Sequence, residues 1–280
     1  MPRLAAFGQE LYVKDSLLAA RLALQAADRA DLQRRLVSRL PQRSESTRTR
    51  IAEKIIQRLI GRNRRAPLSS PLIRLLVGTD DTQAQTELVF HRAAITDEII
   101  AAIAIDIFYP HFVRERVPKG FTKQQFLLAN TAALFEFDRV ITRQFISTYA
   151  REVWGFEGEP TLSRALRILR QAGVLQPLTR VEDRRRVLSY VPTARPLSEA
   201  AFAYLAYEDC LGRGLTRPAI DQIQGAGFAR IFLQSPVQIA ALADAARRRR
   251  LLRASGAAGG RRLALTCDSL DEVVARLLGE

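Results

Sequence analysis

The stretch that decides the fold is TLSRALRILRQAG, residues 161–173, with the segment VLQPLTRVEDRRRVLSYVPT, residues 174–193, that follows it. Pro160 and Thr161 are typical of a helix start, and Gly173 of a helix stop. At about 100° per residue, the apolar side chains of this helix share one face and the arginines line an adjacent one. The apolar set is Leu162, Ala165, Leu166 and Leu169, and the cationic set is Arg164, Arg167 and Arg170. The sequence predicts a helix that buries one side and offers cations on another.

A two-stranded hairpin is predicted directly after this helix. Residues 174–178 and 187–191 are largely apolar, and they flank a charged turn at residues 182–186. Helix, short stop and hairpin follow one another in the order of a winged-helix module. In such a module the helix enters the major groove of DNA and the basic hairpin tip reaches the flanking backbone or minor groove. The tip arginines are Arg180, Arg184, Arg185 and Arg186. Winged-helix folds also bind proteins, so this second interpretation stays open.

A basic helix is also predicted near the N-terminus. Apolar spacing over residues 17–40 indicates two amphipathic helices that end at Pro41. Residues 43–48 supply helix-capping side chains, and a further helix then runs to Gly61. Its polar face and the segment after it carry the candidate DNA-binding cations Arg43, Arg48, Arg50, Lys54, Arg58, Arg62, Arg64 and Arg65. A solvated helix face is the alternative interpretation, although few acidic partners lie nearby.

Helices are predicted for most of the remaining chain. In the middle they cover about residues 72–76, 83–92, 97–108, 123–130 and 139–149, and their phenylalanines and tyrosines are interpreted as core rather than as stacking platforms for bases. Beyond Pro196 the predicted helices cover 200–211, 218–224, a long segment from Ser235-Pro236 and 269–278. The long helix ends in an arginine run at 247–253, and strand-like residues follow at 261–266. That run is either a solvated helix end or a phosphate-binding site.

The predicted fold class is therefore mainly α. A multi-helix N-terminal bundle is followed by a winged-helix-like module and a C-terminal helix-plus-hairpin unit. A chain of 280 residues exceeds the usual size of one domain. We place the boundaries at 1–155 for the helical domain, 156–195 for the winged-helix-like helix and hairpin, and 196–280 for the C-terminal helical and hairpin unit.

Charge predicts a polyanionic partner. There are 43 Lys and Arg residues against 29 Asp and Glu residues, so the formal net charge is +14, which favours double-stranded DNA as partner. A GC-rich genome would explain why the cations are mostly arginine, but it would not explain the net charge. With only Cys210 and Cys267, the chain suggests neither a disulfide framework nor a thiolate zinc site. No signal peptide or membrane span is recognisable, so a cytoplasmic location without membrane contact is expected.

No sequence motif for catalysis is recognisable in the chain. The chain contains no G-x-x-x-x-G-K-[ST] loop, no G-x-G-x-x-G and no G-x-S-x-G elbow, and its two histidines lie in no metal-binding pattern. The candidate carboxylate groups for a nuclease are Asp80 with Asp81, Asp97 with Glu98 and Asp106, and Glu182 with Asp183. A helix first turn explains Asp97 and Glu98, and turn chemistry explains Glu182 and Asp183. The lysines offer no Glu-x-Lys triplet of the kind that a restriction-type nuclease needs. We therefore expect no enzyme activity, no cofactor and no metal site.

Several segments resemble the BrxA-type family of small proteins from BREX phage-exclusion systems. They are Asp15-Ser16-Leu17-Leu18-Ala19-Ala20, the Arg-Ser-Glu-Ser-Thr segment at 43–47, and RILRQAGVL at 167–175, and the likeness extends over about residues 15–191. The resemblance implies a helical, nonenzymatic protein with a fold like that of bacterial antitermination factors. It also implies DNA binding beside larger defence components such as a methyltransferase and ATPases. The part beyond about Pro196 lies outside this likeness.

Three functional hypotheses follow from the sequence. The first is a nonenzymatic DNA-binding component of an antiphage BREX system, with double-stranded DNA and other BREX subunits as partners. The second is a structural adaptor that binds proteins in a multi-subunit defence complex. The third is a transcriptional regulator, which would need sequence-specific operator binding, usually as a dimer. The sequence leaves open the oligomeric state and whether the basic segments share a surface.

Overall fold

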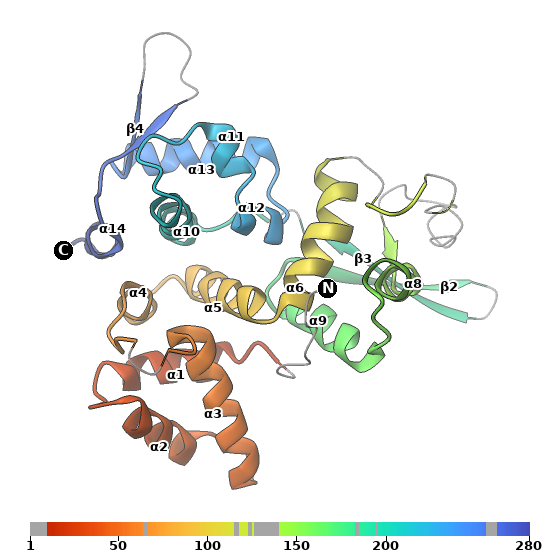
Figure 1. The fold of residues 1–280 in the computed structure, drawn as a ribbon, viewed down its shortest axis with the longest axis horizontal. Helices are drawn as coiled ribbons and strands as arrows, with labels where there is room; N and C mark the ends of the chain where they lie inside the picture. The colour runs from red at the N-terminus through yellow and green to blue at the C-terminus, as the bar shows by residue number, and fades with distance from the viewer. Residues whose placement is uncertain are drawn as a thin grey trace. The chain divides into compact units, whose positions relative to one another are not determined.

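The chain is mainly helical, with two small antiparallel sheets, as predicted (Figure 1). The structure is a computed structural model, and it describes residues 10–63, 66–114, 118–122, 125, 140–182, 185–193, 195–255 and 262–280. For residues 180–182 and 185–186 it describes the backbone only. No helix in these ranges is long and apolar enough to cross a bilayer.

Two compact units make up the chain, and each is discontinuous in sequence. The first includes described residues within 97–196 and 229–235, and the second includes those within 11–96, 197–228 and 236–280. This division differs from the three consecutive segments expected from the sequence. The reason is that α14 (Leu270–Leu278) packs against both α4 (Pro71–Gly78) and α10 (Glu199–Gly212), which groups the C-terminal helices with the N-terminal ones.

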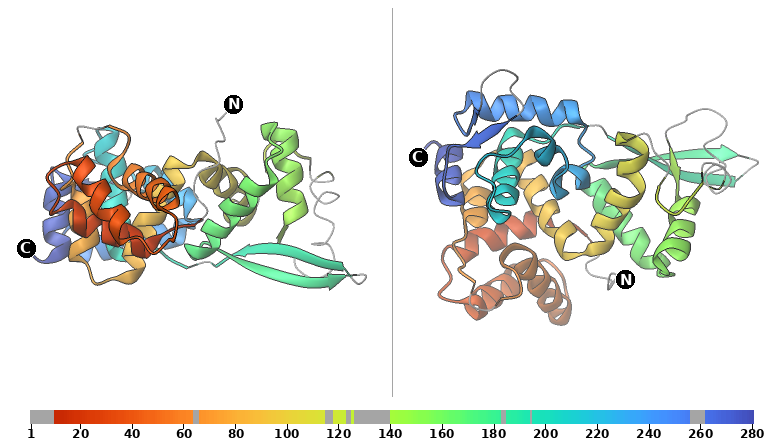
Figure 2. Two further views of the ribbon diagram at one scale, coloured as in Figure 1. Left: turned by 90° about the horizontal axis from the view of Figure 1, so that it is seen from below. Right: turned by 45° about the horizontal axis from the view of Figure 1, so that its top comes forward.

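The first unit contains a winged-helix-like module. Its elements are β1 (Ile141–Thr142), α8 (Arg143–Trp154), α9 (Glu159–Gln171), β2 (Leu175–Glu182) and β3 (Arg185–Pro192). The strands form an antiparallel sheet in the order β1-β3-β2. The order of elements is that of a winged helix: a strand, two helices and a hairpin. The last strand of the hairpin, β3, pairs with the opening strand, β1. The hairpin extends beyond α8 and α9 as a twisted ribbon (Figure 2).

Strand β1 corrects one prediction. The sequence favoured a helix from residue 139, but Ile141 and Thr142 pair with Tyr190 and Ser189 of β3. Both residues of β1 are buried, and the Thr142 side chain then caps α8 by accepting a hydrogen bond from the Phe145 N–H at 3.1 Å. A two-residue strand is too short to give a recognisable alternation, which is why the helix pattern was extended through it.

The segment 97–108, which the sequence predicts as one helix, consists of two consecutive helices of different type. It begins as α6 (Glu98–Ala102) and continues as a π-helix, η1 (Ile103–Val113), which contains Pro110. At its end the Arg114 N–H donates to the carbonyl of Tyr109, five residues earlier, at 3.2 Å. Because Pro110 has no N–H to donate, it disturbs a regular α-helix, and this accounts for the wider turn of the π-helix here. Of the helix predicted at 123–130, only residue 125 lies within the described residues.

The core of the first unit contains buried residues of α6, α8 and α9. Helix α6 packs against α9, and Phe145, Ile146 and Tyr149 of α8 are almost completely buried. Phe121 lies 5.2 Å from Phe145 and 5.6 Å from Tyr149 between ring centroids. The predicted core role is confirmed for Phe145, and Phe121 packs against it.

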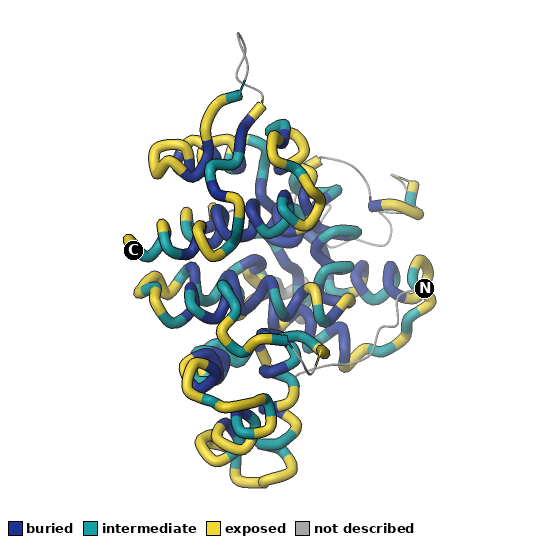
Figure 3. The backbone as a smooth tube through the Cα atoms, turned by 60° about the vertical axis from the view of Figure 1, so that its left-hand side comes forward, coloured by how far each residue is buried: buried dark blue, intermediate teal, exposed yellow. Residues whose placement is uncertain are grey.

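The second unit begins with three helices that pack on one another, α1 (Val13–Ala23), α2 (Arg29–Arg39) and α3 (Glu45–Ile60). Helix α4 and α5 (Thr82–Thr96) cover α1. The predicted amphipathic helices ending before Pro41 and at Gly61 are confirmed. Buried and exposed residues alternate along the helices, as amphipathic segments require (Figure 3).

The remainder of the second unit is the C-terminal helix-plus-hairpin part. Helix α10 is followed by α11 (Ile220–Gln224), the short α12 (Gly227–Ile231) and α13 (Pro236–Arg248). Only the first residues of α12 belong to this unit. Strands β4 (Leu252–Ala254) and β5 (Leu263–Leu265) pair antiparallel, and α14 ends the chain. The Ser269 side chain caps α14, accepting from the Glu272 N–H at 3.3 Å. The predicted order of helix, hairpin and final helix is confirmed.

Candidate nucleic-acid interface

Helix α9 has the two faces that the sequence predicts. Its apolar residues Leu162, Ala165, Leu166 and Leu169 are each at most 2% exposed. Arg167 and Arg170 are exposed, and Arg164 is partly exposed. In the described parts of the chain, none of these three guanidinium groups has a hydrogen-bond or ion-pair partner. A spacing of three residues places them along one side of the helix, available to a phosphate backbone.

The start of α9 is fixed by a side-chain cluster that joins it to α8. Arg143, the first residue of α8, donates from Nε to Oε1 of Glu159 at 2.9 Å and from Nη2 to Oγ of Ser163 at 2.6 Å. The Ser147 hydroxyl donates to Oε2 of Glu159 at 2.9 Å. Glu159 lies in the first turn of α9, where a negative charge suits the helix dipole. The cluster joins α9 to α8. It was not predictable from the sequence, because its residues on α8 lie 12 to 20 positions away from its residues on α9.

The hairpin pairs along its whole described length. The register runs from Leu175 opposite Pro192 to Glu182 opposite Arg185. Arg184 lies outside the described residues, and for Arg180, Arg185 and Arg186 only the backbone is described. Both strands are longer than predicted. The strands carry these backbone positions out to the end of the ribbon, where a wing would meet DNA.

The basic segment around α3 belongs to the second unit and is less uniform than predicted. Arg43, Arg50 and Arg62 are exposed, and Arg48 and Lys54 are partly exposed. Arg48 is engaged in folding, since its Nη1 donates to the carbonyls of Gln42 at 2.8 Å and Arg43 at 3.2 Å. Arg62 donates from Nε to the side-chain oxygen of Gln57 at 2.6 Å. Arg64 and Arg65 lie outside the described residues.

Arg58 does not lie on the predicted basic face. It is 3% exposed and is buried beside the apolar residues of α3. Its position, seven residues after Ile51, places it on the same side of the helix as the core. A guanidinium group so enclosed does not reach a phosphate outside the protein, so Arg58 is not part of the candidate interface.

Of the carboxylates considered for nuclease chemistry, Asp183 lies outside the described residues and Glu182 is described by its backbone only, while Asp81, Asp97 and Asp106 have structural surroundings. Oδ1 of Asp81 accepts from the backbone N–H groups of Gln83 and Ala84 at 2.9 and 3.0 Å, which caps the start of α5. Asp97 is 2% exposed. Burial raises the pKa of Asp106, while hydrogen bonding to Trp154 and the charges of Arg230 and Lys119 oppose this shift. Over the described ranges, no three His, Cys, Asp or Glu side chains are grouped so that they could hold a metal ion.

Comparisons of the chain with models of known protein families, with curated proteins and with solved structures give no match. The fold and the side chains themselves therefore define the class of protein: a mainly helical chain whose first unit contains a winged-helix-like module with an arginine face on α9.

Proposed function

We propose that this protein binds double-stranded DNA through α9 and the β2–β3 hairpin and has no catalytic role. The single observation that carries the proposal is the arginine face of α9, set on the second helix of a strand–helix–helix–hairpin unit. In modules with this order of elements, that helix enters the major groove and the hairpin contacts the flanking backbone. The exposed cations of α3, principally Arg50, supply a second basic surface on the other unit.

Electrostatics support this proposal over a merely solvated helix face. A solvated face usually carries both signs of charge, so that neighbouring groups compensate one another. On α9 the acidic residue nearest the arginines is Glu159, and it is already neutralised by Arg143. The uncompensated charge would be satisfied by phosphates, with release of condensed counterions as the driving force.

The cellular setting that we propose is bacterial phage exclusion. The resemblance of residues 15–191 to BrxA-type proteins is its basis, with other BREX subunits as further partners. In that setting the DNA-binding chain works within a larger assembly that supplies the enzymatic steps. A structural adaptor and a transcriptional regulator are the competing functions, and the same experiment separates all three.

The experiment is a fluorescence-anisotropy titration of the full chain with unrelated duplexes of equal length at several salt concentrations. We expect binding that ignores sequence and weakens steeply with salt. The Arg164→Ala/Arg167→Ala/Arg170→Ala variant should lose at least tenfold in affinity. The matched control is Arg21→Ala/Arg213→Ala/Arg217→Ala, which removes the same charge from exposed positions of the second unit and should lose much less.

Other outcomes would contradict the proposal in distinct ways. Absence of binding near physiological salt, with co-purification of a methyltransferase or ATPase, would select the adaptor. Strong preference for one sequence by a dimer would select a transcriptional regulator. Equal losses in the two triple variants would show that net charge, and not the face of α9, determines binding.

A further inference from the structure

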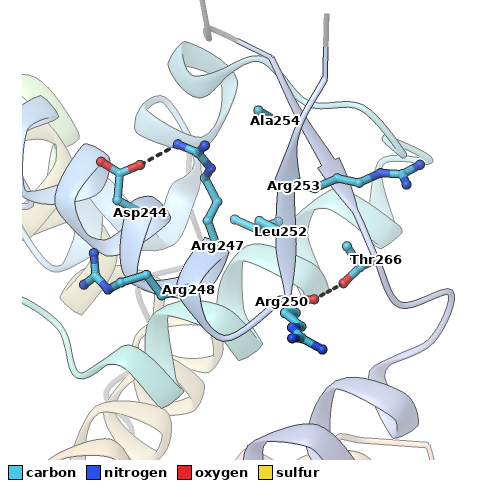
Figure 4. A pocket seen from close by; sticks show the side chains of 8 residues that line it. All are labelled: Asp244, Arg247, Arg248, Arg250, Leu252, Arg253, Ala254 and Thr266. Carbon is cyan, nitrogen blue, oxygen red and sulfur yellow. Dashed lines mark hydrogen bonds and ion pairs between the residues drawn. The ribbon is translucent and has the colours of Figure 1, made fainter.

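A second basic site lies in the C-terminal part of the second unit, where α13 ends and β4 begins. A pocket of about 690 Å³ is lined there by Asp244, Arg247, Arg248, Arg250, Leu252, Arg253, Ala254 and Thr266. Leu252 and Ala254 point to the α13 side of β4, and Arg253 points to the other side (Figure 4). The pocket thus has an apolar floor and a rim of guanidinium groups.

Backbone carbonyl groups at the end of α13 accept hydrogen bonds from backbone N–H groups and not from these arginine side chains. The Leu251 N–H donates to the carbonyl of Ala246 at 3.0 Å, and the Arg250 N–H donates to that of Arg247 at 2.9 Å. These two bonds form a Schellman motif, which satisfies the last turn of the helix from its own backbone. The arginine side chains are therefore left for another role.

Arg250 occupies the position of that motif where glycine is preferred. Its φ is +59°, in the left-handed region, which costs a residue with a side chain roughly 1 kcal/mol relative to glycine. The turn is held from two sides, because Thr266 Oγ1 and Arg276 Nη1 both donate to the Arg250 carbonyl, at 2.6 and 3.0 Å. Strain that is maintained at a fixed position in this way points to a function of the side chain.

The charges around the pocket are poorly compensated. Arg247 pairs with Asp244 at 2.9 Å, but Arg248, Arg250 and Arg253 have no hydrogen-bond or ion-pair partner for their side chains in the part of the chain that is described. The helix dipole supplies only about half a negative charge at this end. Four arginines against one carboxylate exceed what is needed to stabilise the helix end. Their long side chains point in different directions around the pocket, with Arg253 on the other side of β4 from Arg247 and Arg248 (Figure 4). An anion that contacts more than one of these guanidinium groups must therefore carry several charged groups along its length.

We propose that this pocket binds a free polyphosphate, such as the triphosphate group of a nucleotide, through Arg248, Arg250 and Arg253. Closely spaced phosphates match several guanidinium groups, each of which can donate two parallel hydrogen bonds. Ala254, which is exposed beside these arginines, offers a small apolar surface for a ring attached to the phosphates. The site belongs to the second unit, whereas α9 belongs to the first, and it does not depend on the DNA-binding proposal.

The test is isothermal titration calorimetry of the full chain with inorganic triphosphate and with ATP, at two salt concentrations. We expect saturable binding to one site that weakens with salt and falls at least tenfold in Arg250→Gly/Arg253→Ala. Glycine at 250 suits the left-handed backbone, so this variant should keep its fold, which thermal unfolding would check. The control Arg213→Ala/Arg217→Ala removes the same charge and should bind as the unaltered chain does.

Three results would overturn this site. The first is no triphosphate binding at low salt, and the second is an equal loss in the control variant, which would indicate general charge attraction. The third is competition for the pocket by duplex DNA alone, which would make it part of the nucleic-acid surface. The Arg164→Ala/Arg167→Ala/Arg170→Ala variant should retain triphosphate binding, so failure of either proposal is recognised independently of the other.

Discussion

Arg143, the first residue of α8, forms an ion pair with Glu159, the first residue of α9, with Nε and Oε1 2.9 Å apart. The pair joins the starts of the two helices in the winged-helix-like module. It also places the only acidic side chain of α9 at one end of its arginine face. The contact therefore affects both the orientation of α9 and the charge that α9 presents.

Glu159→Gln should strengthen duplex binding several-fold, because it removes a negative charge beside the arginine face and releases Arg143. The free energy of unfolding should fall by less than about 1 kcal/mol, since an exposed pair contributes little and the two side chains are 37% and 48% exposed. Anisotropy titration and chemical denaturation measure the two effects. Asp80→Asn, an exposed residue of the other unit, is the control and should bind as the unaltered chain does. Unchanged affinity in Glu159→Gln would show that Glu159 does not lie near the duplex.

Thr142→Ala should destabilise the first unit by about 1 kcal/mol, the usual cost of losing a helix N-cap. The hydroxyl accepts from the Phe145 N–H in a buried position, where water does not readily replace it. Trp154, the only tryptophan, ends α8, so its fluorescence during urea unfolding reports on this unit. Thr142→Ser keeps the oxygen and should lose little; a comparable loss in Thr142→Ser would assign the effect to the missing methyl group.

The fold was predictable from the sequence where local signals are strong. Helix starts and stops at Pro160, Gly173, Gly61 and Ser269 are encoded by residues with specific backbone preferences or capping groups. The hairpin and its place after α9 followed from apolar runs on either side of a charged turn. On α9, the faces of the helix followed from spacing alone, and the burial of its residues agrees with them.

What the sequence did not reveal depends on contacts between distant residues. Strand β1 has two residues and exists because β3 pairs with it. Glu159 contacts Arg143 only because the fold brings the starts of α8 and α9 together. Arg58 looked like a solvent-facing cation because its neighbours Lys54 and Arg62 are polar, yet its side chain lies with the core of α3. The grouping of α14 with α4, supported by the Arg74–Asp271 ion pair, joins residues 197 positions apart.

Acid should destabilise the protein through His91. Burial first, and then the charge of Arg92, lower the pKa of His91 from 6.5 to about 3. Between these two pH values the unfolded chain takes up a proton that the folded chain excludes, so stability falls as the pH falls from 6.5 toward 3. The slope from this one group reaches about 1.4 kcal/mol per pH unit. His91→Gln should flatten the pH dependence of urea unfolding between pH 7 and 5, where most carboxylates remain ionised. An identical slope in the variant would show that His91 stays ionisable in the folded state.

Tyr207→Phe should lower the free energy of unfolding by about 1–3 kcal/mol, the cost of leaving the buried Cys267 N–H without its partner. The Tyr207 hydroxyl, on a side chain 1% exposed, donates to the Leu251 carbonyl and accepts from the N–H groups of Thr266 at 2.8 Å and Cys267 at 3.2 Å. Burial raises the pKa of Tyr207, which keeps the hydroxyl protonated as a donor.

The Tyr207→Phe variant also tests which contacts stabilise the backbone turn at Arg250. Thr266 Oγ1 donates to the Arg250 carbonyl, and Tyr207 fixes the backbone of Thr266. Loss of the hydroxyl should therefore weaken triphosphate binding as well as stability, although Tyr207 does not line the pocket. Tyr204→Phe, in the same helix, is the control for stability without an effect on the turn. Reduced stability with unchanged triphosphate affinity would mean that Arg276, which also donates to the Arg250 carbonyl, is sufficient to hold the turn.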